Sequence, residues 1–274
     1  MATVNRKVLP GLTLSLGYTL FYLTTLVLLP IAACFLRASE LTLAELTEAV
    51  WTERARAAYL LTFGASFVAA IANVILGLLL AWVLVRYAFP GKKLVDSLID
   101  LPLALPTAVA GLVYSALYVK KGWLGQFLVP LGIQGAYSRF GIVLVLIFVG
   151  LPFVVRTVQP ILEDMDPESE EASASLGATR WQTFTSVILP TLRPALITGF
   201  ALAFARGIGE YGSVVFVSGN MPYKTEIAPI LIVARLEEFA YGEATAIAVV
   251  LLVVSFGLLV VINRLERWSL RHEH

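Results

Sequence analysis

The sequence has few of the residues that build disulfide scaffolds and metal sites. A single cysteine, Cys34, among 274 residues excludes an intrachain disulfide and a cysteine cluster for a metal. The two histidines, His272 and His274, both lie in the C-terminal tail. The apolar segments contain no carboxylate pair or metal-ligand cluster, so we predict neither a metal site nor catalytic residues for hydrolytic chemistry.

Charge is scarce as well. Only 14% of the residues are charged, whereas a soluble domain has about a quarter. The 20 basic and 19 acidic residues nearly cancel, so nucleic acid is not an expected partner. The phosphate-binding pattern G-x-x-x-x-G-K-[ST] is missing, because Gly91-Lys92-Lys93 lacks both the preceding glycine and the hydroxyl residue. We therefore expect that this chain binds no nucleotide or other cofactor itself.

Apolar residues, in contrast, make up 58% of the chain. Several apolar runs exceed the roughly 20 residues that a helix needs to cross a bilayer. This pattern predicts an all-α polytopic membrane protein in lipid, with residues 1–274 forming one transmembrane domain. We expect six spans, at about 11–36, 57–85, 98–119, 140–161, 195–217 and 244–263.

The third expected span contains two prolines, Pro102 and Pro106. Each removes a backbone donor and displaces a carbonyl. In lipid such a helix is tolerated only where protein or a cavity satisfies the freed groups. We therefore expect a kinked helix that faces protein.

Basic residues in the loops predict the orientation. With the N-terminus inside, where Arg6 and Lys7 precede the first span, eleven Lys and Arg residues lie inside and eight outside. The first apolar stretch is too long for a cleaved signal, so we interpret it as a retained helix. Both termini and the loop 162–194 are then expected in the cytoplasm.

That loop is a polar segment between two apolar spans. Asp166-Pro167 is typical of a helix start, and Glu168, Glu170 and Glu171 favour a helix N-terminus. Gly177 is expected to end this helix in a left-handed conformation. In the following amphipathic stretch, Trp181, Phe184 and Ile188 share one face. Periodicity alone allows either a simple interfacial connector or a docking element for another protein.

The spacing inside this loop resembles a known pattern. Glu171-Ala172-Ser173, three residues, Gly177, nine residues, Val187, one residue and Leu189-Pro190 resemble the cytoplasmic loop of bacterial ABC-importer permeases. Ser173 stands where that family has a second alanine, and Val187 where it has isoleucine. The resemblance implies a coupling helix that docks on a separate ATPase. The docking residues would be Glu170, Glu171, Ala172, Ser173, Ala174, Leu176 and Gly177.

Two charges fall deep inside the fifth expected span. Arg206 and Glu210 are four residues apart and can pair on one helix face. Since an arginine at mid-membrane is costly, Arg206 should face protein or water. The pair either fixes helix register or lines the path of an anion. Asn73, on a ridge of small residues in the second span, is expected to bond across to another helix, and Asn73 and Thr107 complete the predicted pathway set.

A narrower resemblance follows from three segments. Residues 204–212, 218–229 and 100–111 look like those of sulfate/thiosulfate permease subunits of ABC importers. The resemblance implies a second homologous permease in a heterodimer, two ATPase subunits that carry ATP and Mg, and a sulfate-binding protein. It also implies an external mouth at Asn220, Tyr223, Lys224 and Thr225.

The function expected from these patterns is sulfate or thiosulfate import through a bacterial inner membrane, with ATP hydrolysed by a partner chain. Molybdate and tungstate permeases share the coupling loop and the arginine-glycine-glutamate segment, and form one alternative. The segment 223–229 favours sulfate. A stand-alone secondary anion transporter is the other alternative; it would need no docking loop and should show inverted repeats, which are not evident in the sequence.

Overall fold

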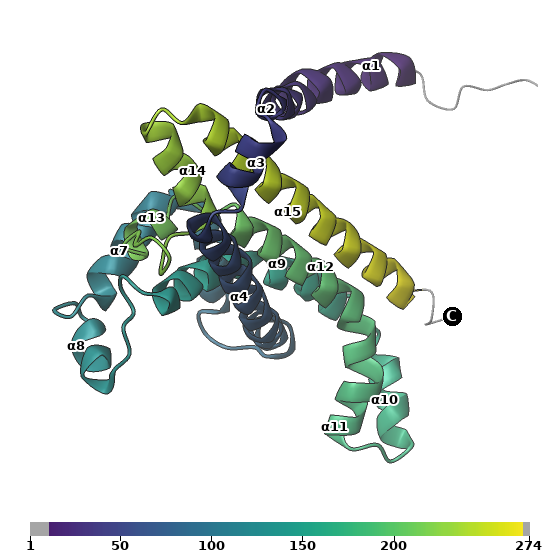
Figure 1. Cartoon of the computed structure of the whole chain (residues 1–274). Helices are drawn as coiled ribbons and strands as arrows, with labels where there is room; N and C mark the ends of the chain where they lie inside the picture. Colours follow the sequence, from purple (N-terminus) through teal and green to yellow (C-terminus); the bar gives the residue numbers. More distant parts are fainter. Residues whose placement is uncertain (1–10, 271–274) are drawn as a thin grey trace, which may run out of the picture.

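The computed structural model of the protein describes residues 11–270, without the side chains of 263 and 265–270. The expectations that concern Arg6, Lys7, His272 and His274 lie outside the described residues. Within 11–270 the chain is all helix and turn, with no strand (Figure 1). Five helices are long and apolar enough to cross a membrane: Leu12–Ser39, Glu53–Arg86, Arg139–Glu163, Arg180–Ile208 and Tyr241–Ile262.

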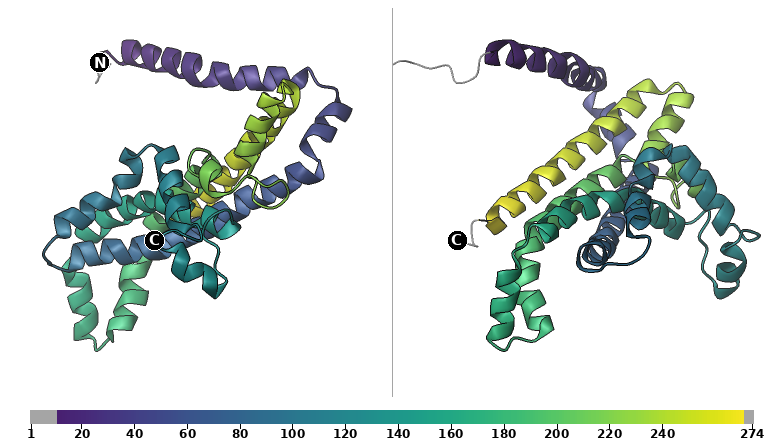
Figure 2. Two further views of the ribbon diagram at one scale, coloured as in Figure 1. Left: turned by 90° about the vertical axis from the view of Figure 1, so that its left-hand side faces the viewer. Right: turned by 180° about the vertical axis from the view of Figure 1, so that it is seen from behind.

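The first of these long helices comprises α1 (Leu12–Leu23), η1 (Thr24–Leu28) and α2 (Leu29–Ser39), and α3 (Leu43–Val50) follows. Its α1 part lies away from the rest of the molecule in both views of Figure 2, whereas α2 contacts α15. No part of the most apolar window of this long helix is buried. The others include α4 (Glu53–Arg86), α9 (Arg139–Glu163), α12 (Leu189–Ile208) and α15 (Tyr241–Leu270).

The expected third span is not one kinked helix. Residues 92–118 form three pieces, α5 (Lys92–Ile99), α6 (Leu101–Ala104) and α7 (Thr107–Tyr118). Pro102 stands in the first turn of α6, and Pro106 caps the start of α7. Both prolines therefore begin new helices, and the single span expected at 98–119 was wrong in this respect. Short α8 (Gly125–Leu128) and η2 (Val129–Leu131) lead on to α9.

The fifth expected span, 195–217, is also interrupted. Its helix ends at Ile208, and the chain then turns through residues 209–213 before the short α13 (Val214–Val217). Gly209 and Gly212 lie in this interruption. The loop that follows leads to α14 (Ala228–Glu237) and then to α15. Glu210 is consequently not on the helix that carries Arg206 but just beyond its end.

Helices α4, α9 and α12 form the core. They approach closely because small residues lie where they meet: a Cβ on Gly77 of α4 would be 2.7 Å from Val154 of α9, and one on Gly199 of α12 would be 2.6 Å from Thr157. Such small residues let helix backbones come together in membranes. The expected small-residue ridge of α4 is confirmed, since Ala65, Ala69, Gly77 and Ala81 are all buried.

Two functional regions lie at opposite ends of α4 (Figures 1 and 2). The polar hairpin formed by α10 (Pro167–Ser175) and α11 (Arg180–Thr183) projects beyond the end of α4 that carries Arg86. The loop 218–227 is bound near the other end, where α4 begins. The fold thus separates the predicted docking loop from the predicted external mouth by the length of a spanning helix.

Candidate functional site

The polar hairpin begins with the helix that the sequence predicts. Asp166 caps α10, and its Oδ1 accepts a hydrogen bond from the Glu168 amide at 3.0 Å. Gly177 has φ +84°, a left-handed conformation that suits glycine. The Gly177 amide donates to the Ala174 carbonyl at 2.9 Å and the Ala178 amide to the Ser173 carbonyl at 3.2 Å. These two bonds form a Schellman cap, so the predicted bounds of this helix are confirmed.

The second arm of the hairpin holds the first in place. Thr179 and Gln182 form a capping box at the start of α11, and η3 (Phe184–Ile188) continues into α12. The hydroxyl groups of Ser173 and Thr183 are 3.0 Å apart and join the two arms. The rings of Trp181 and Phe184 stack with their centroids 5.7 Å apart. Ile188 is buried in the core, which ties this arm to the membrane body.

The predicted docking residues divide into two groups. Ser173 and Glu170 turn inward, to Thr183 and to Arg86 at the end of α4. The other five, Glu171, Ala172, Ala174, Leu176 and Gly177, are exposed, and Leu176 is 90% exposed. No residue of α10 is buried. A large apolar side chain beside small and acidic ones thus faces outward on a rigid, doubly capped helix.

Sequence reasoning missed Arg86. Its guanidinium forms an ion pair with Glu170 and lies over the Trp82 ring, 5.3 Å from the centroid. The only local signal was a basic residue at the end of an apolar span.

Sequence reasoning also missed a second arginine, Arg156 of α9. Its Nη1 donates to Asp96 at 2.7 Å, and Nε and Nη2 donate to the Asp100 carboxylate at 2.9 and 2.6 Å. This network attaches α5 and the start of α6 to the core near the same end of the molecule as α10. Asp100 opens the proline-containing stretch 100–111, so the network places that stretch relative to α9.

Arg206 and Glu210 pair as predicted. The Glu210 side chain is 2% exposed, and the second carboxylate oxygen accepts from the Ser213 amide at 2.9 Å and from the Ser213 hydroxyl at 2.8 Å. Both oxygens of Glu210 are therefore occupied. Arg206 is 33% exposed. The Glu210 carboxylate is thus buried beneath the Arg206 guanidinium, which reaches the surface of the chain.

Thr107 lies at the same interruption. A Cβ on Gly212 would be 2.1 Å from the Thr107 hydroxyl, and one on Gly111 would be 2.2 Å from the Ser213 carbonyl. The first turns of α7 therefore press directly on the residues that hold Glu210. Glycine is required at both positions because neither contact leaves room for a side chain.

Asn73 does not share this site. It is 1% exposed and packs against Gly150 of α9, where a Cβ would be 2.3 Å from its amide nitrogen. Among the described residues, neither its amide nitrogen nor its carbonyl oxygen has a hydrogen-bond partner. The expected bond from Asn73 to another helix was therefore wrong.

The predicted external mouth is a tightly bonded loop. Asn220 and Tyr223 have φ of 50° and 65°, and the Thr225 hydroxyl accepts from the Met221 amide at 3.0 Å. Tyr223 and Lys224 are exposed, whereas Thr225 is 3% exposed and holds the turn from within. The Lys224 carbonyl accepts from Arg139 Nε at 2.8 Å, which fastens the loop to the start of α9.

A second anchor joins this loop to α4. Arg54 donates to both oxygens of Glu226, each at 2.8 Å, and the Glu226 side chain is 3% exposed. The Ala228 amide donates to the Thr62 hydroxyl at 2.8 Å. Glu226 is therefore a buried anchor of this loop and not a solvated side chain.

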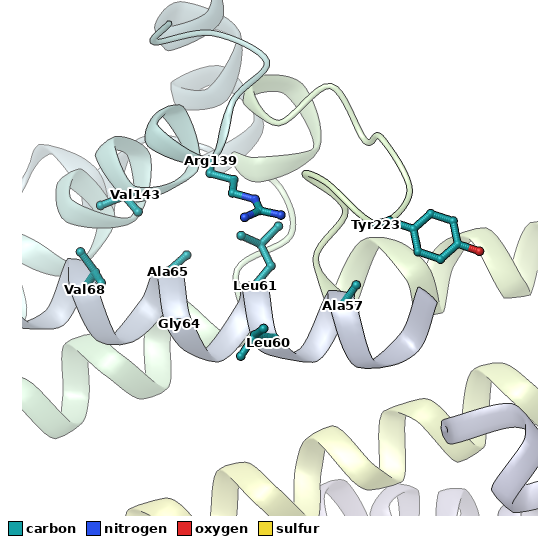
Figure 3. Close-up of a pocket in the computed structure, with 9 residues that line it drawn as sticks. All are labelled: Ala57, Leu60, Leu61, Gly64, Ala65, Val68, Arg139, Val143 and Tyr223. Carbon is teal, nitrogen blue, oxygen red and sulfur yellow. The ribbon is translucent and has the colours of Figure 1, made fainter. Parts of the chain in front are cut away.

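A hollow of about 290 Å³ lies beside this loop, between α4 and the start of α9 (Figure 3). Its walls include Leu60, Leu61, Val68 and Val143, and Arg139 is the one charged residue among those that line it. Tyr223 also lines the hollow, and its ring extends away from the other labelled side chains in Figure 3. The rest of the wall is apolar, so Arg139 is the one side chain of the lining with a charge that could attract an anion.

Comparison with known proteins identifies the family. A family model described as "Binding-protein-dependent transport system inner membrane component" matches residues 73–272. The chain belongs to this family. It is therefore the membrane component of a binding-protein-dependent transport system and not an enzyme, and its place is the inner membrane. The resemblance of the loop 166–190 to importer permeases is thereby confirmed.

Individual relatives match over nearly their whole length. The chain is 49% identical to the sulfate transport system permease protein CysT of Salmonella typhimurium, over 97% of this chain and 96% of that protein. It is 48% identical to the protein of the same name from Escherichia coli, over the same shares of the two chains. The corresponding protein of Synechococcus elongatus is 50% identical over 96% of this chain and 95% of that one.

Solved structures show the same fold at low sequence identity. A bacterial ABC transporter involved in import of the acidic polysaccharide alginate aligns with a TM-score of 0.76 and 18% identity, over 93% of this chain and 94% of that one. The alginate transporter in complex with a pentasaccharide-bound periplasmic protein aligns with a TM-score of 0.77 and 20% identity, over 93% of each chain. The all-α polytopic fold is thus confirmed.

Proposed function

We propose that this chain is a permease subunit of an ATP-driven importer that moves sulfate, or thiosulfate, into the cytoplasm. The observation that carries the proposal is the identity of 48–50% to permeases named for sulfate transport, over at least 96% of this chain. The complete system would contain a second homologous permease, two ATPase subunits that bind ATP and Mg, and a sulfate-binding protein.

The outward face of α10 is the proposed contact with the ATPase. Ala172, Leu176 and Gly177 form it, while Glu170 and Ser173 support it from behind. Glu171 and Ala174 are exposed at its edge, where they also line the hollow between α10 and Trp82, and they belong to the same proposed contact. The small alanines allow close approach, and Leu176 offers an apolar anchor. Docking on the cytoplasmic side places the loop 218–227 outside, where a binding protein can deliver the anion, and places both termini in the cytoplasm. The basic-residue bias of the loops supports the same orientation.

The proposed anion path passes the interruption after α12. Arg206 is a partly exposed cation in a spanning segment, and lipid is a poor environment for it. Both carboxylate oxygens of Glu210 already have partners, so the group that the site exposes is the Arg206 guanidinium. The Thr107 hydroxyl lies near the same interruption. We keep Arg206, Glu210 and Thr107 in the pathway, with Glu210 orienting Arg206. The enclosed position of Asn73 favours a packing role for that residue.

Reconstitution with its partners tests the function. The chain is co-purified with its bound subunits, placed in liposomes with ATP on the ATPase side, and supplied with binding protein and labelled sulfate. We expect uptake and ATP hydrolysis that both depend on sulfate. Turnover that responds to molybdate and not to sulfate would refute the substrate. Uptake by the purified chain without an ATPase would refute the importer and favour a secondary transporter.

Crosslinking tests the docking face. In a Cys34→Ala background, cysteines at Ala172 and Ala174 should crosslink to the ATPase subunit. Phe239, 77% exposed in the turn between α14 and α15, supplies the matched control position, from which no such crosslink should form. Failure of both positions on α10 to reach the ATPase would contradict the docking role.

A further inference from the structure

One helix is bonded to both functional regions. At its last residue, Arg86, α4 forms an ion pair with Glu170 of the docking helix. In its first turns, Arg54 forms a bidentate ion pair with Glu226, and Thr62 accepts from the Ala228 amide. The docking helix and the outer loop are therefore each tied to α4, at opposite ends, by an arginine and a glutamate.

The contact at the docking end is organised in advance. Arg86 lies over the Trp82 ring, and that ring meets Phe184 edge-on with 5.8 Å between centroids. Both aromatic residues pack on the core of α4, α9 and α12. A side chain held by its neighbours loses little further freedom when it forms an ion pair. Arg86 is thus a fixed point to which α10 is fastened.

Little else seats α10 on the membrane body. A hollow of about 410 Å³ separates it from Trp82, Phe184 and Ile188. Among the described residues, the pair between Arg86 and Glu170 is the one ion pair or hydrogen bond from α10 to a helix outside its own hairpin. Without it, α10 would be free to tilt into the hollow when a partner pushes on its outer face.

Helix α4 is suited to carry such a push over the membrane. It runs for 34 residues without a break, which corresponds to about 51 Å. It has no proline, whereas α9 contains Pro152 and Pro160 and α12 contains Pro194. Since proline kinks or weakens a helix, α4 is the stiffer of the three core helices.

We propose that α4 is a strut that couples the docking helix to the outer loop, with Arg86 and Arg54 as the positioning residues that fasten its two ends. The inference rests on the proposed function. A push on α10 moves α4 along its small-residue ridge and shifts the loop 218–227. Coupling between binding sites is reciprocal, so a protein that binds at the outer loop should in turn affect the ATPase through the same helix.

A double-mutant cycle tests the strut. Arg86→Gln and Arg54→Gln are made singly and together in the reconstituted transporter, and ATP hydrolysis is measured with and without anion-loaded binding protein. Each single change should lower the stimulation by about threefold or more, as expected for loss of a partly buried ion pair. Because both residues act through one helix, the stimulation in the double variant should be no lower than in the single variant that has the lower stimulation. Basal hydrolysis should stay within about twofold of the wild type, an estimate taken from typical exposed-pair energies.

Matched controls are available nearby. Arg56→Gln removes an exposed arginine two residues from Arg54. The Arg56 guanidinium lies over the Trp51 ring, 6.0 Å from its centroid. Glu168→Gln changes an exposed glutamate on the same helix as Glu170. Both should keep the wild-type stimulation. Exchange of the two charges, Arg86→Glu with Glu170→Arg, should recover part of the stimulation that Arg86→Gln loses.

Three outcomes would overturn the strut. The first is wild-type stimulation in Arg86→Gln. The second is a double variant whose fold-loss of stimulation equals the product of the two single fold-losses, since independent sites contribute additively to the free energy. The third is loss of the ATPase subunits from Arg86→Gln on purification, which would assign the pair to docking alone. Failure of the unmodified transporter to respond to sulfate would refute the proposed function instead.

Discussion

The ion pair at the end of α12 should respond unequally to removal of its two partners. In Arg206→Gln, the Glu210 carboxylate, 2% exposed, keeps its bonds from Ser213 but loses its cation in a place that water does not reach. Breaking a buried pair in this way costs about 3–5 kcal/mol. In Glu210→Gln, the amide oxygen still accepts from Ser213, and Arg206, 33% exposed, can recover solvation. We expect a smaller loss of about 1–2 kcal/mol there.

The double variant decides whether the pair itself carries this energy. Arg206→Gln with Glu210→Gln leaves no unpaired charge, so it should be more stable than Arg206→Gln alone by about 2 kcal/mol. The unfolding midpoint Tm in detergent, followed by tryptophan fluorescence, would report this as a recovery of about 4–8 °C. Arg193→Gln, an exposed arginine on the same helix, is the control and should change the free energy of unfolding by less than about 0.5 kcal/mol.

Sulfate uptake by the same variants distinguishes a packing role of the pair from direct contact between Arg206 and the passing anion. If Arg206 contacts the anion as proposed, the double variant regains stability but not uptake. Recovery of both would assign the pair to packing alone. A double variant no more stable than Arg206→Gln, or a larger loss in Glu210→Gln than in Arg206→Gln, would refute the reasoning from burial.

Three further predictions follow from the glycines and the buried amide. Gly177→Pro removes the amide that donates to the Ala174 carbonyl, and proline cannot adopt φ +84°. Anion-stimulated ATP hydrolysis should therefore be lost, while membrane insertion, measured by fractionation, stays normal. Preserved stimulation would contradict the docking role. Gly111→Ala places a Cβ 2.2 Å from the Ser213 carbonyl oxygen. We expect Tm to fall by several degrees, because overpacking a core lowers the free energy of unfolding by about 1–3 kcal/mol. Gly64→Ala, where the added Cβ meets open space, is the control and should leave Tm unchanged. Asn73→Leu removes two unpartnered polar atoms from a buried site. The free energy of unfolding should therefore stay equal or rise by up to about 1–2 kcal/mol. A marked fall in Tm would show that the amide has a partner.

The features that the sequence predicts correctly have local causes. The bounds of α10 follow from Asp166 and Gly177, which act on backbone groups within a few residues. The pairing of Arg206 with Glu210 needs only a spacing of four. The spans α4, α9 and α15 follow from long apolar runs, because lipid imposes its requirement on each segment separately.

Only the tertiary structure decided which distant residues meet. The partners of Arg54 and Arg86 are 172 and 84 residues away along the chain, and Asn73 proved to face a glycine and not a polar group. Pro106 and the glycines Gly209 and Gly212 signal the interruptions at 105–106 and 209–213 locally, but the close packing of α7 on Ser213 is a tertiary contact that no local pattern reveals. Hydropathy determines which segments enter the membrane, since transfer from water to lipid depends on composition. Contacts between the segments depend on shape and charge in three dimensions, and these arise only when the helices pack.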